Sequence, residues 1–405
     1  MESSIEPIEG GTVTSPAGFQ AAAAHAGIRY NPNKFDLGLL YSEAPCAAAA
    51  VYTANRVRAA PLLVTEEHLA DGRAQAVIAN SGCANAATGR RGLEDARAMA
   101  RLAARKLGLD ASDVAVASTG VIGTFLPMAK IEAALETMAL GRERGLDFSL
   151  AIMTTDTRPK HLALRFGPYT LGAAAKGAGM IHPNMATMLC FLTTDAPVAQ
   201  PFLQRALREA VDDSFNLIDV DSDTSTNDMV LVMANGLAGG EPIDEGHPLA
   251  GTFREALLLA CQEMGRAIVA DAEGATRVIQ VTVVGAASRQ DARRAAREVV
   301  RSLGVKTAIK GADPNWGRIV AAVGNSGCEL DLDRLCLWLL DPDGNDLCLF
   351  CLGQPEPFDA VRAKELLRQP DVRFRIDLGL GEGAATAWGS DLTEDYVRLN
   401  SLYTT

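Results

Sequence analysis

The 405-residue sequence is poor in aromatic side chains and has no excess of basic residues. Phe, Trp and Tyr make up 5% of it, and the formal net charge is −12 at pH 7. Nucleic acids and anionic membrane surfaces are bound by basic faces, so this charge balance argues against both as partners. No apolar run approaches the about 18 residues of a membrane span. The 48% hydrophobic content is that of a globular protein, for which we expect small-molecule or protein partners.

A disulfide framework and a targeting segment are also missing. Most cysteines stand among apolar neighbours, which favours reduced, buried thiols. All the cysteines of the chain are Cys46, Cys83, Cys190, Cys261, Cys328, Cys336, Cys348 and Cys351. Cys348 and Cys351 form a CxxC pair without the second pair that a zinc site needs. The N-terminal MESSIEPIEGG has neither the basic nor the apolar region of a signal peptide. We therefore expect a cytoplasmic protein that holds neither a metal nor a cofactor.

Several familiar catalytic and binding motifs fail on inspection. In Gly324–Cys328 the second glycine of a GxSxG elbow is misplaced, and Gly379–Ala384 precedes a strand where a dinucleotide loop requires a helix. Asp219–Asp223 resembles the start of a calcium loop. However, Thr224 takes the place of the required glycine, and Val230 that of the bidentate glutamate. A turn fixed by side-chain hydrogen bonds is the better interpretation.

Hydrophobic periodicity predicts an α/β protein of two units. Short apolar runs predict buried strands at 75–79, 114–117, 188–192, 229–233 and 277–284. Amphipathic patterns predict helices at 94–107, 126–138, 201–211, 249–268 and 291–303. A hairpin is expected over 335–352, closed by DPDGN. The change of pattern places a boundary near 285–290, giving a main domain of about 1–285 and a subdomain of about 286–405.

One nucleophile stands out in the segment Lys176–Leu189, which reads KGAGMIHPNMATML. Thr187 follows the small residue Ala186, an arrangement suited to self-cleavage of the Ala186–Thr187 bond. An N-terminal threonine carries its own base, because its α-amine titrates at about 7.7–8.0. Gly177 and Gly179 permit the backbone strain that such a cut requires. The alternative is a structural threonine in a strand.

Two polar stretches are candidate partners of this nucleophile. Ser118-Thr119-Gly120 follows a short strand and offers a hydroxyl and an unhindered N–H, the parts of an oxyanion hole, although a simple turn explains it equally well. The cluster Thr154–Thr157 follows an apolar run and suits either a helix cap or a substrate contact.

These motifs resemble, almost end to end, the ornithine acetyltransferase family, the glutamate N-acetyltransferases of arginine biosynthesis. The resemblance rests on the 176–189 segment and on NSGCANA (80–86), STGVIG (118–123), IMTTDT (152–157), DTSTND (223–228), DPNWGR (313–318) and WGSDLTEDYVRLNSLYTT (388–405). The sequence departs from the family pattern at Ser222, where a glycine is expected, and at Ser390, where a cysteine is expected. Neither departure involves the nucleophile.

The resemblance implies an αββα-type sandwich of the self-processing aminopeptidase kind, with a C-terminal α/β subdomain whose tail returns to the active site. Cleavage would give an α chain of residues 1–186 and a β chain of 187–405, assembled as an α2β2 heterotetramer. It implies Thr187 as nucleophile and Thr119 and Gly120 as the oxyanion hole. The implied substrate-binding residues are Thr155, Lys176, Thr187, Glu273, Asn400 and Thr405.

The reaction that the resemblance implies is transfer of an acetyl group from N2-acetylornithine to L-glutamate through an acetyl-threonine ester. Acetyl-CoA is a further candidate donor, as a substrate and not a cofactor. The alternative is an N-terminal-nucleophile amidohydrolase or aminopeptidase of the same fold, in which water accepts the acyl group. A non-enzymatic binding protein that kept the fold is a third reading, and failure to cleave would favour it.

Overall fold

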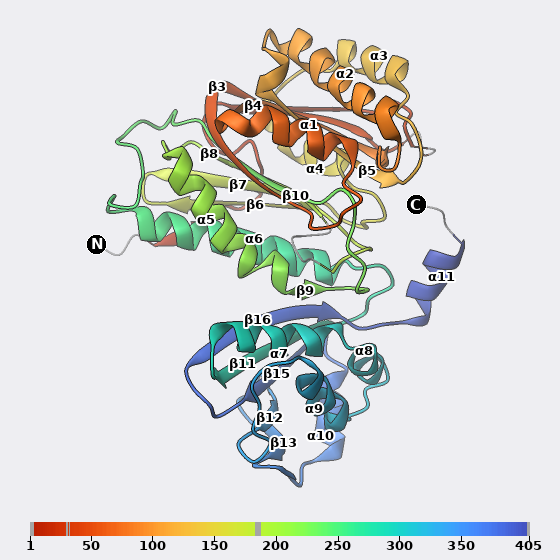
Figure 1. Ribbon diagram of the computed structural model, residues 1–405, viewed down its shortest axis with the longest axis vertical. Helices are drawn as coiled ribbons and strands as arrows, with labels where there is room; N and C mark the ends of the chain where they lie inside the picture. The colour runs from red at the N-terminus through yellow and green to blue at the C-terminus, as the bar shows by residue number, and fades with distance from the viewer. Residues whose placement is uncertain (1–3, 30, 32, 183–187, 403–405) are drawn as a thin grey trace.

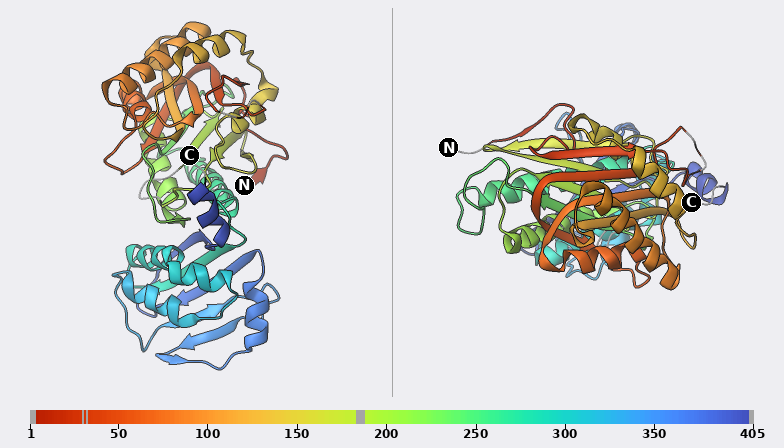
Figure 2. Two further views of the ribbon diagram at one scale, coloured as in Figure 1. Left: turned by 90° about the vertical axis from the view of Figure 1, so that its right-hand side faces the viewer. Right: turned by 90° about the horizontal axis from the view of Figure 1, so that it is seen from above.

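The structure is a computed structural model that describes residues 4–29, 31, 33–182 and 188–402. Its chain forms two units, each built on one mixed β-sheet, and they lie one above the other in Figure 1. The first unit surrounds a nine-stranded sheet and the second a seven-stranded sheet. The left view of Figure 2 shows the same stacking of the two units.

The nine-stranded sheet has the order β1-β6-β7-β8-β10-β3-β4-β5, with β2 also paired to β3. Its strands are β1 (Ile5–Pro7), β2 (Phe19–Ala24), β3 (Leu37–Tyr52), β4 (Arg73–Cys83), β5 (Val114–Val121), β6 (Lys160–Phe166), β7 (Tyr169–Lys176), β8 (Leu189–Thr194) and β10 (Met229–Ala234). The long strand β3 joins its two halves. In β3, residues 37–42 pair with β2 and residues 47–52 pair with β10. Residues 37–41 and 46–47 pair with β4, across a register shift.

Alternation of side chains in these strands builds a four-layer sandwich. In β4, Val77 and Ala79 point into a core shared by both halves of the sheet, and their neighbours Ala76 and Ile78 face the other way, toward helices. The period of two residues along a strand produces this division. Helices α1 (Ala60–His68), α2 (Gly89–Leu107) and α3 (Met128–Thr137) cover one outer face, and α5 (Gln200–Asp212) and α6 (Ala250–Ala270) cover the other. The short helix α4 (Gly145–Ala151) also packs in this unit. The expected αββα architecture is therefore confirmed.

The second unit has the strand order β14-β13-β12-β15-β11-β16-β9. Its strands are β9 (Ile218–Asp219), β11 (Val278–Ala286), β12 (Cys336–Leu339), β13 (Leu347–Cys351), β14 (Gln354–Pro355), β15 (Asp371–Asp377) and β16 (Gly383–Ser390). Its helices are α7 (Arg289–Arg301), α8 (Leu303–Lys310), α9 (Trp316–Asn325) and α10 (Ala360–Leu367). After β16 the chain leaves this unit and forms α11 (Glu394–Leu402), which lies to one side (Figure 1).

The predicted strands and helices all occur, with ends that differ by a few residues. The second sheet nevertheless draws on earlier chain than the boundary expected near 285, because it contains β11 and the short strand β9. Its edge strand β9 comes from residues 218–219, between β8 and β10 of the first sheet, and pairs with β16. The two units are therefore connected by more than one crossing of the chain.

One expectation about the cysteines was wrong. Cys336 and Cys351 are joined by a disulfide, whereas reduced thiols were expected throughout. They come together because they are opposite each other in the antiparallel pair β12–β13, a relation that the scattered sequence spacing does not reveal. The other six cysteines are free, and Cys190 and Cys261 are fully buried.

Candidate active site

The two ends of the segment that carries the expected nucleophile lie side by side. Lys176, the last residue of β7, is the register partner of Leu189, the first residue of β8. The KGAGMIHPNMATML segment is therefore a connection between adjacent antiparallel strands. Ala186 and Thr187 lie outside the described residues, as does Thr405.

A pocket beside these strand ends brings together every described residue expected in the site. It has a cavity volume of about 100 Å³ and is partly open to solvent. The expected residues that line it are Thr119, Gly120, Thr155, Lys176, Glu273 and Asn400. They come from β5, from the loop after α4, from β7, from the turn after α6 and from α11. These positions span most of the chain, so the fold alone makes them neighbours.

Thr119 and Gly120 lie where β5 runs beside the end of β4. Gly120 pairs with Gly82 and has a φ of 129°, and a side-chain carbon there would lie 2.4 Å from the Gly82 carbonyl carbon. Both the φ and the close approach require glycine. Thr119 is 9% exposed, and its Oγ1 accepts a hydrogen bond of 3.3 Å from Lys176 Nζ. A hydroxyl and a backbone N–H at the pocket wall are thus in place.

Lys176 is buried among charged partners. Burial lowers the pKa of Lys176, while the nearby Asp156 opposes that shift. Burial also disfavours ionisation of Asp156, but Lys176, Lys160 and the Gly177 N–H outweigh it and hold the pKa of Asp156 below its usual range. Asp156 Oδ1 accepts from Gly177 N at 2.8 Å and from Lys160 Nζ at 2.7 Å. This carboxylate therefore fixes the start of the segment that follows β7.

The IMTTDT motif forms one wall of the pocket. Thr154 and Thr155 both line it, and Thr154 N donates to Asp156 Oδ2 at 2.8 Å. The alternative of a helix cap does not hold, because the cluster follows the end of α4 and leads into β6. Thr154 and Thr155 therefore line the pocket, and the Asp156 side chain holds their loop in place by a hydrogen bond.

Glu273 and Asn400 also line the pocket. Glu273 N donates to Ala178 O at 2.9 Å, which ties the turn after α6 to the segment after β7. Asn400 Nδ2 donates to Glu273 Oε2 at 2.8 Å. A side-chain carbon at Gly179 would lie 2.6 Å from the Glu273 carboxyl group, so the absence of a side chain there lets Glu273 take its position.

Sequence reasoning missed three polar residues of this pocket. Ser225, Asn227 and Asp228 line it, and all belong to the DTSTND motif, which was recognised without a role. Asn227 Nδ2 donates to Ala84 O at 2.7 Å and to Ser118 O at 2.9 Å. Burial raises the pKa of Asp228 well above its ordinary value. The signal available in the sequence was the density of small polar residues directly before a buried strand.

The neighbouring Asp219–Asp223 stretch is a hydrogen-bonded turn, as expected. Asp221 Oδ1 accepts from Asp223 N at 3.3 Å and from Ile181 N at 2.8 Å. Among the residues that the structure describes, no group of three or more His, Cys, Asp or Glu side chains could hold a metal ion. Of the helices within the described ranges, none is long and apolar enough to cross a membrane.

A wider groove adjoins the pocket and shares Gly120, Thr154 and Thr155 with it. The charged residues that line this groove are all basic; they are Arg29, Lys34 and Lys130. Two apolar residues line the same groove: Val121 at the end of β5 and Phe125 in the loop that follows. This basic groove is notable in a chain of net charge −12, and it suits an anionic ligand.

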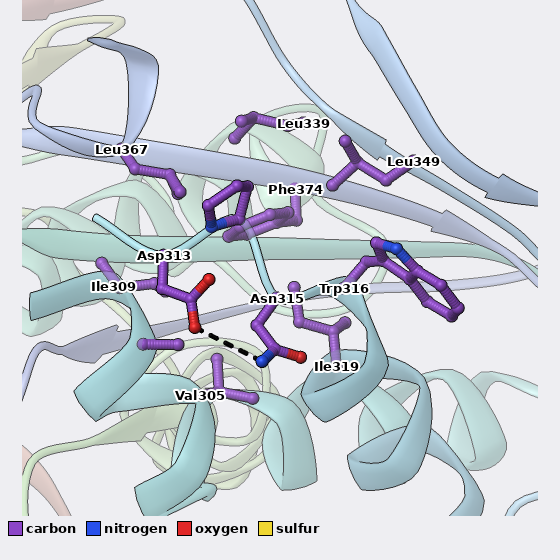
Figure 3. A pocket seen from close by; sticks show the side chains of 12 residues that line it. Val305, Ile309, Asp313, Asn315, Trp316, Ile319, Leu339, Leu349, Leu367 and Phe374 are labelled. Carbon is purple, nitrogen blue, oxygen red and sulfur yellow. Dashed lines mark hydrogen bonds between the residues drawn. The ribbon is translucent and has the colours of Figure 1, made fainter. Parts of the chain in front are cut away.

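The DPNWGR motif lies elsewhere, in the second unit (Figure 3). Trp316 stacks on Phe350 with ring centroids 5.2 Å apart, and Asn315 Nδ2 donates to Asp313 Oδ2 at 3.3 Å. Asp313, Asn315 and Trp316 line a mainly apolar pocket to which none of the expected site residues contributes. The motif therefore opens α9 and packs the second core.

Comparison with known proteins shows the family of the chain. A sequence model of the ArgJ family matches residues 20–405. The chain belongs to the ArgJ family. The resemblance found in the sequence motifs is thus confirmed, and the match spans both units of the fold.

Relatives in the ArgJ family match over almost their full length. The arginine biosynthesis bifunctional protein ArgJ of Symbiobacterium thermophilum is 52% identical over 402 residues, covering 98% of this chain and 99% of that protein. The protein of the same name from Bacillus subtilis is 47% identical over 400 residues, covering 98% of this chain and 97% of the relative.

Two solved ArgJ-type structures are also similar. The ArgJ protein of Bacillus halodurans is 43% identical with a TM-score of 0.49, covering 52% of this chain and 97% of that chain. The ornithine acetyltransferase of Mycobacterium tuberculosis, solved with ornithine, is 43% identical with a TM-score of 0.42, covering 45% of this chain and 100% of that chain.

The structure also explains one departure from the ArgJ pattern. Ser222 has a φ of 65°, in the left-handed region that favours glycine, which is the residue expected there. Ser390, the other departure, is buried at the end of β16 opposite Val278. Both positions lie outside the residues that line the pocket.

Proposed function

We propose that this chain transfers an acetyl group from N2-acetylornithine to L-glutamate, after cutting itself between Ala186 and Thr187. The freed Thr187 is the nucleophile, and its α-amine is the base. Its hydroxyl attacks the acetyl carbonyl, ornithine leaves, and glutamate then takes the acetyl group from the threonyl ester. The observation that carries the proposal is the pocket that gathers Thr119, Gly120, Thr155, Lys176, Glu273 and Asn400 beside the ends of β7 and β8.

The charges of the pocket suit these substrates. Lys176 and Glu273 are complementary to the carboxylate and the amino groups of ornithine and glutamate. Thr119 Oγ1 and the Gly120 N–H are the donors proposed for the tetrahedral oxyanion. Thr155 and Asn400 complete the substrate contacts, and Thr405 is expected to join them from the end of the tail. A ping-pong acetyl transfer needs no metal or cofactor.

Acetyl-CoA is proposed as a second acetyl donor, which would make the chain an amino-acid N-acetyltransferase as well. Two observations support it. The similar proteins of Symbiobacterium thermophilum and Bacillus subtilis are named bifunctional. The groove with Arg29, Lys34 and Lys130 opens from the acetyl pocket and suits the phosphates of such a donor. Formation of N-acetylglutamate from acetyl-CoA and glutamate alone is the assay that decides this point.

The experiment that tests the main proposal compares the wild type with Thr187→Ala. Denaturing electrophoresis should show two wild-type fragments that begin at Met1 and Thr187, and one uncut band for the variant. Wild-type enzyme with N-acetylornithine and glutamate should form N-acetylglutamate, and Thr187→Ala should not. An intact, active wild-type chain would contradict self-cleavage, and substantial activity in the variant would contradict the nucleophile.

The same assay separates acetyl transfer from hydrolysis. An amidohydrolase of this fold would release acetate even in the presence of glutamate, because water would accept the acyl group. Accumulation of N-acetylglutamate at the expense of acetate supports the transferase. An assembly of α and β chains as an α2β2 heterotetramer in the cytoplasm is proposed alongside, and light scattering after gel filtration measures the mass of the assembly.

A further inference from the structure

The five residues 178–182, the last described before the proposed cut, are held by side chains and backbone from much later in the chain. Asp221 accepts hydrogen bonds from Met180 N at 2.6 Å and from Ile181 N at 2.8 Å. Val220 N donates to Ile181 O at 2.7 Å, and Thr224 Oγ1 donates to His182 O at 2.8 Å. All these partners would belong to the β chain if the chain is cut after Ala186.

The side chain of His182 reaches into the second unit. Its Nδ1 lies 2.8 Å from Asp219 Oδ1, and its Nε2 lies 3.0 Å from Arg297 Nη2. A guanidinium can only donate, so Nε2 must carry the lone pair and Nδ1 must carry the proton. The Nδ1–H of His182 is therefore directed at the Asp219 carboxylate.

Asp219 is in turn fixed from the second unit. Lys306 Nζ lies 2.9 Å from Asp219 Oδ2, and it donates to Ser390 O at 2.9 Å and to Asp219 O at 3.2 Å. The side chains of Asp219 and Lys306 are fully buried. Burial disfavours the charge on Asp219, but Lys306 and His182 outweigh it and hold its pKa below the usual range. A buried ion pair whose lysine also donates hydrogen bonds to two backbone carbonyls is a rigid anchor.

The residues of this anchor come from different parts of the fold. Asp219 ends β9, the edge strand that pairs with β16, while Arg297 and Lys306 lie on α7 and α8. His182 follows β7 of the first sheet. His182 contacts Asp219, which pairs with Lys306, and Arg297 contacts the other ring nitrogen of His182. These contacts fix the end of the segment 178–182 to the second unit. We call these four residues the His182 clamp.

We propose that His182 is a positioning residue for the self-cleavage reaction, which it promotes through the hydrogen bond from its Nδ1 to Asp219. This inference rests on the proposed function. His182 lies four residues before Ala186. Fixing His182 therefore restricts the positions that the scissile bond can take. A displacement of about 1 Å from the reactive geometry can cost on the order of 100-fold in rate. His182 does not enter the chemistry of acetyl transfer itself.

The test measures the rate of cleavage in full-length chains made by cell-free translation, followed over time on denaturing gels. His182→Asn places an amide donor where Nδ1 lies, whereas His182→Gln places its amide near Nε2 and leaves Asp219 without that donor. We expect His182→Asn to cut within about threefold of the wild-type rate. His182→Gln and His182→Ala should cut at least about tenfold more slowly, by the positional argument above.

His161→Ala is the matched control. His161 is also a half-buried histidine whose Nδ1 bonds to a single partner, Gly11 O at 2.8 Å, but it lies in β6 and away from the clamp. This variant should cut at the wild-type rate. Molecules of His182→Gln that have been cut should turn over N-acetylornithine and glutamate with a kcat within about threefold of wild type, since the proposed role precedes the acetyl transfer.

Several outcomes would overturn the proposal. Wild-type cleavage in His182→Gln and His182→Ala would remove the role, and equally slow cleavage in His182→Asn would show that the Nδ1 bond is not what matters. If the cleavage rate, kcat and the melting temperature all fell together in the His182 variants, a general structural role would be indicated instead. If the wild-type chain itself stays uncut, the proposed function fails, and that result is distinct from a failure of the His182 variants.

Discussion

Two glycines in the candidate site are needed for different physical reasons. Gly120 combines a φ of 129° with an approach to the Gly82 backbone that leaves no room for a side chain. Gly179 needs no left-handed backbone, but a side chain there would meet the Glu273 carboxyl group. The first glycine is therefore required by the fold at the proposed oxyanion hole, whereas the second leaves room for Glu273, the proposed substrate-binding carboxylate.

Substitution of Gly120 by alanine should lower both stability and activity. The added carbon clashes with backbone that cannot move away, so we expect a loss of more than about 2 kcal/mol, on top of the strain at this φ. Gly123→Ala is the matched control, because Gly123 also has a positive φ but open space around it. Urea denaturation of both variants checks the difference, and equal losses would refute the steric explanation.

Gly179→Ala should separate binding from stability. Glu273 is a flexible side chain that can turn aside, so the melting temperature should change by no more than a few degrees. The displaced carboxyl group should raise KM for N-acetylornithine or glutamate by roughly tenfold, which corresponds to a loss of about 1.4 kcal/mol of binding free energy. Steady-state kinetics and a thermal melt on one preparation measure both. An unchanged KM would mean that Glu273 does not contact substrate.

At the scale of elements, the helix α11 brings a residue from near the end of the chain into a pocket built by the first unit. Its residues are not buried, and Val397 and Leu402 are largely exposed, so packing alone does not explain its position. The hydrogen bonds of Asn400 to Glu273 and of Tyr396 Oη to Asp221 Oδ2, at 3.2 Å, hold it there. The tail is therefore positioned by polar contacts.

Asn400→Ala should weaken substrate binding and leave the fold unchanged. Loss of one hydrogen bond to a charged partner is worth about 1.5–3 kcal/mol, so we expect KM to rise by roughly tenfold or more. Ser401→Ala is the control on the same helix, because its hydroxyl bonds only within the helix, to Arg398 O. Removal of the last five or six residues, including Thr405, should have an effect at least as large as Asn400→Ala. Full turnover by that truncated chain would exclude a role for the tail.

The turn before β10 carries strain that a single substitution should relieve. Ser222 holds a φ of 65°, which costs a residue with a side chain about 1–2 kcal/mol relative to glycine. Ser222→Gly should therefore raise the free energy of unfolding by up to about 1 kcal/mol, since glycine also loses more entropy on folding. Urea denaturation measures this change, and a destabilised variant would contradict the argument.

At the scale of the whole molecule, a buried charge network joins the site to the core. Lys160 Nζ lies 2.7 Å from Asp156 Oδ1 and 2.6 Å from Asp271 Oδ2, and all three side chains are almost completely buried. Asp271 follows α6, so the network connects an outer helix layer to the start of β6 beneath the pocket. Removing one member leaves the others uncompensated in the interior, which is strongly destabilising.

Asp156→Asn should cost about 3–5 kcal/mol at pH 7, measured by urea denaturation in the uncut Thr187→Ala background. The folded pKa of Asp156 lies below its ordinary value of 3.8. Its contribution to stability is therefore fully present above the unfolded pKa and is lost as the pH falls through the folded one. The gap between wild type and variant should shrink as the pH is lowered below about 4. A gap that widens in acid would refute this sign.

The sequence predicted most elements because their signals are local. Apolar runs such as 229–233 and the helix pattern of 249–268 need no tertiary information to be recognised. The pairing of Cys336 with Cys351 was missed, because it depends on the register of two strands. The membership of β9 in the second sheet was missed for the same kind of reason, since a strand of two residues has no pattern of its own.

The sequence by itself determined which residues are candidates. The motifs around Lys176 and Thr119 singled out the candidate site and the ArgJ family. Only the tertiary structure decided that these residues meet in one pocket, that Asn227 and Asp228 belong to it, and that His182 is tied to Asp219. The physical reason is that residue types and short-range periodicity are local properties, whereas a pocket depends on contacts between segments far apart in the chain.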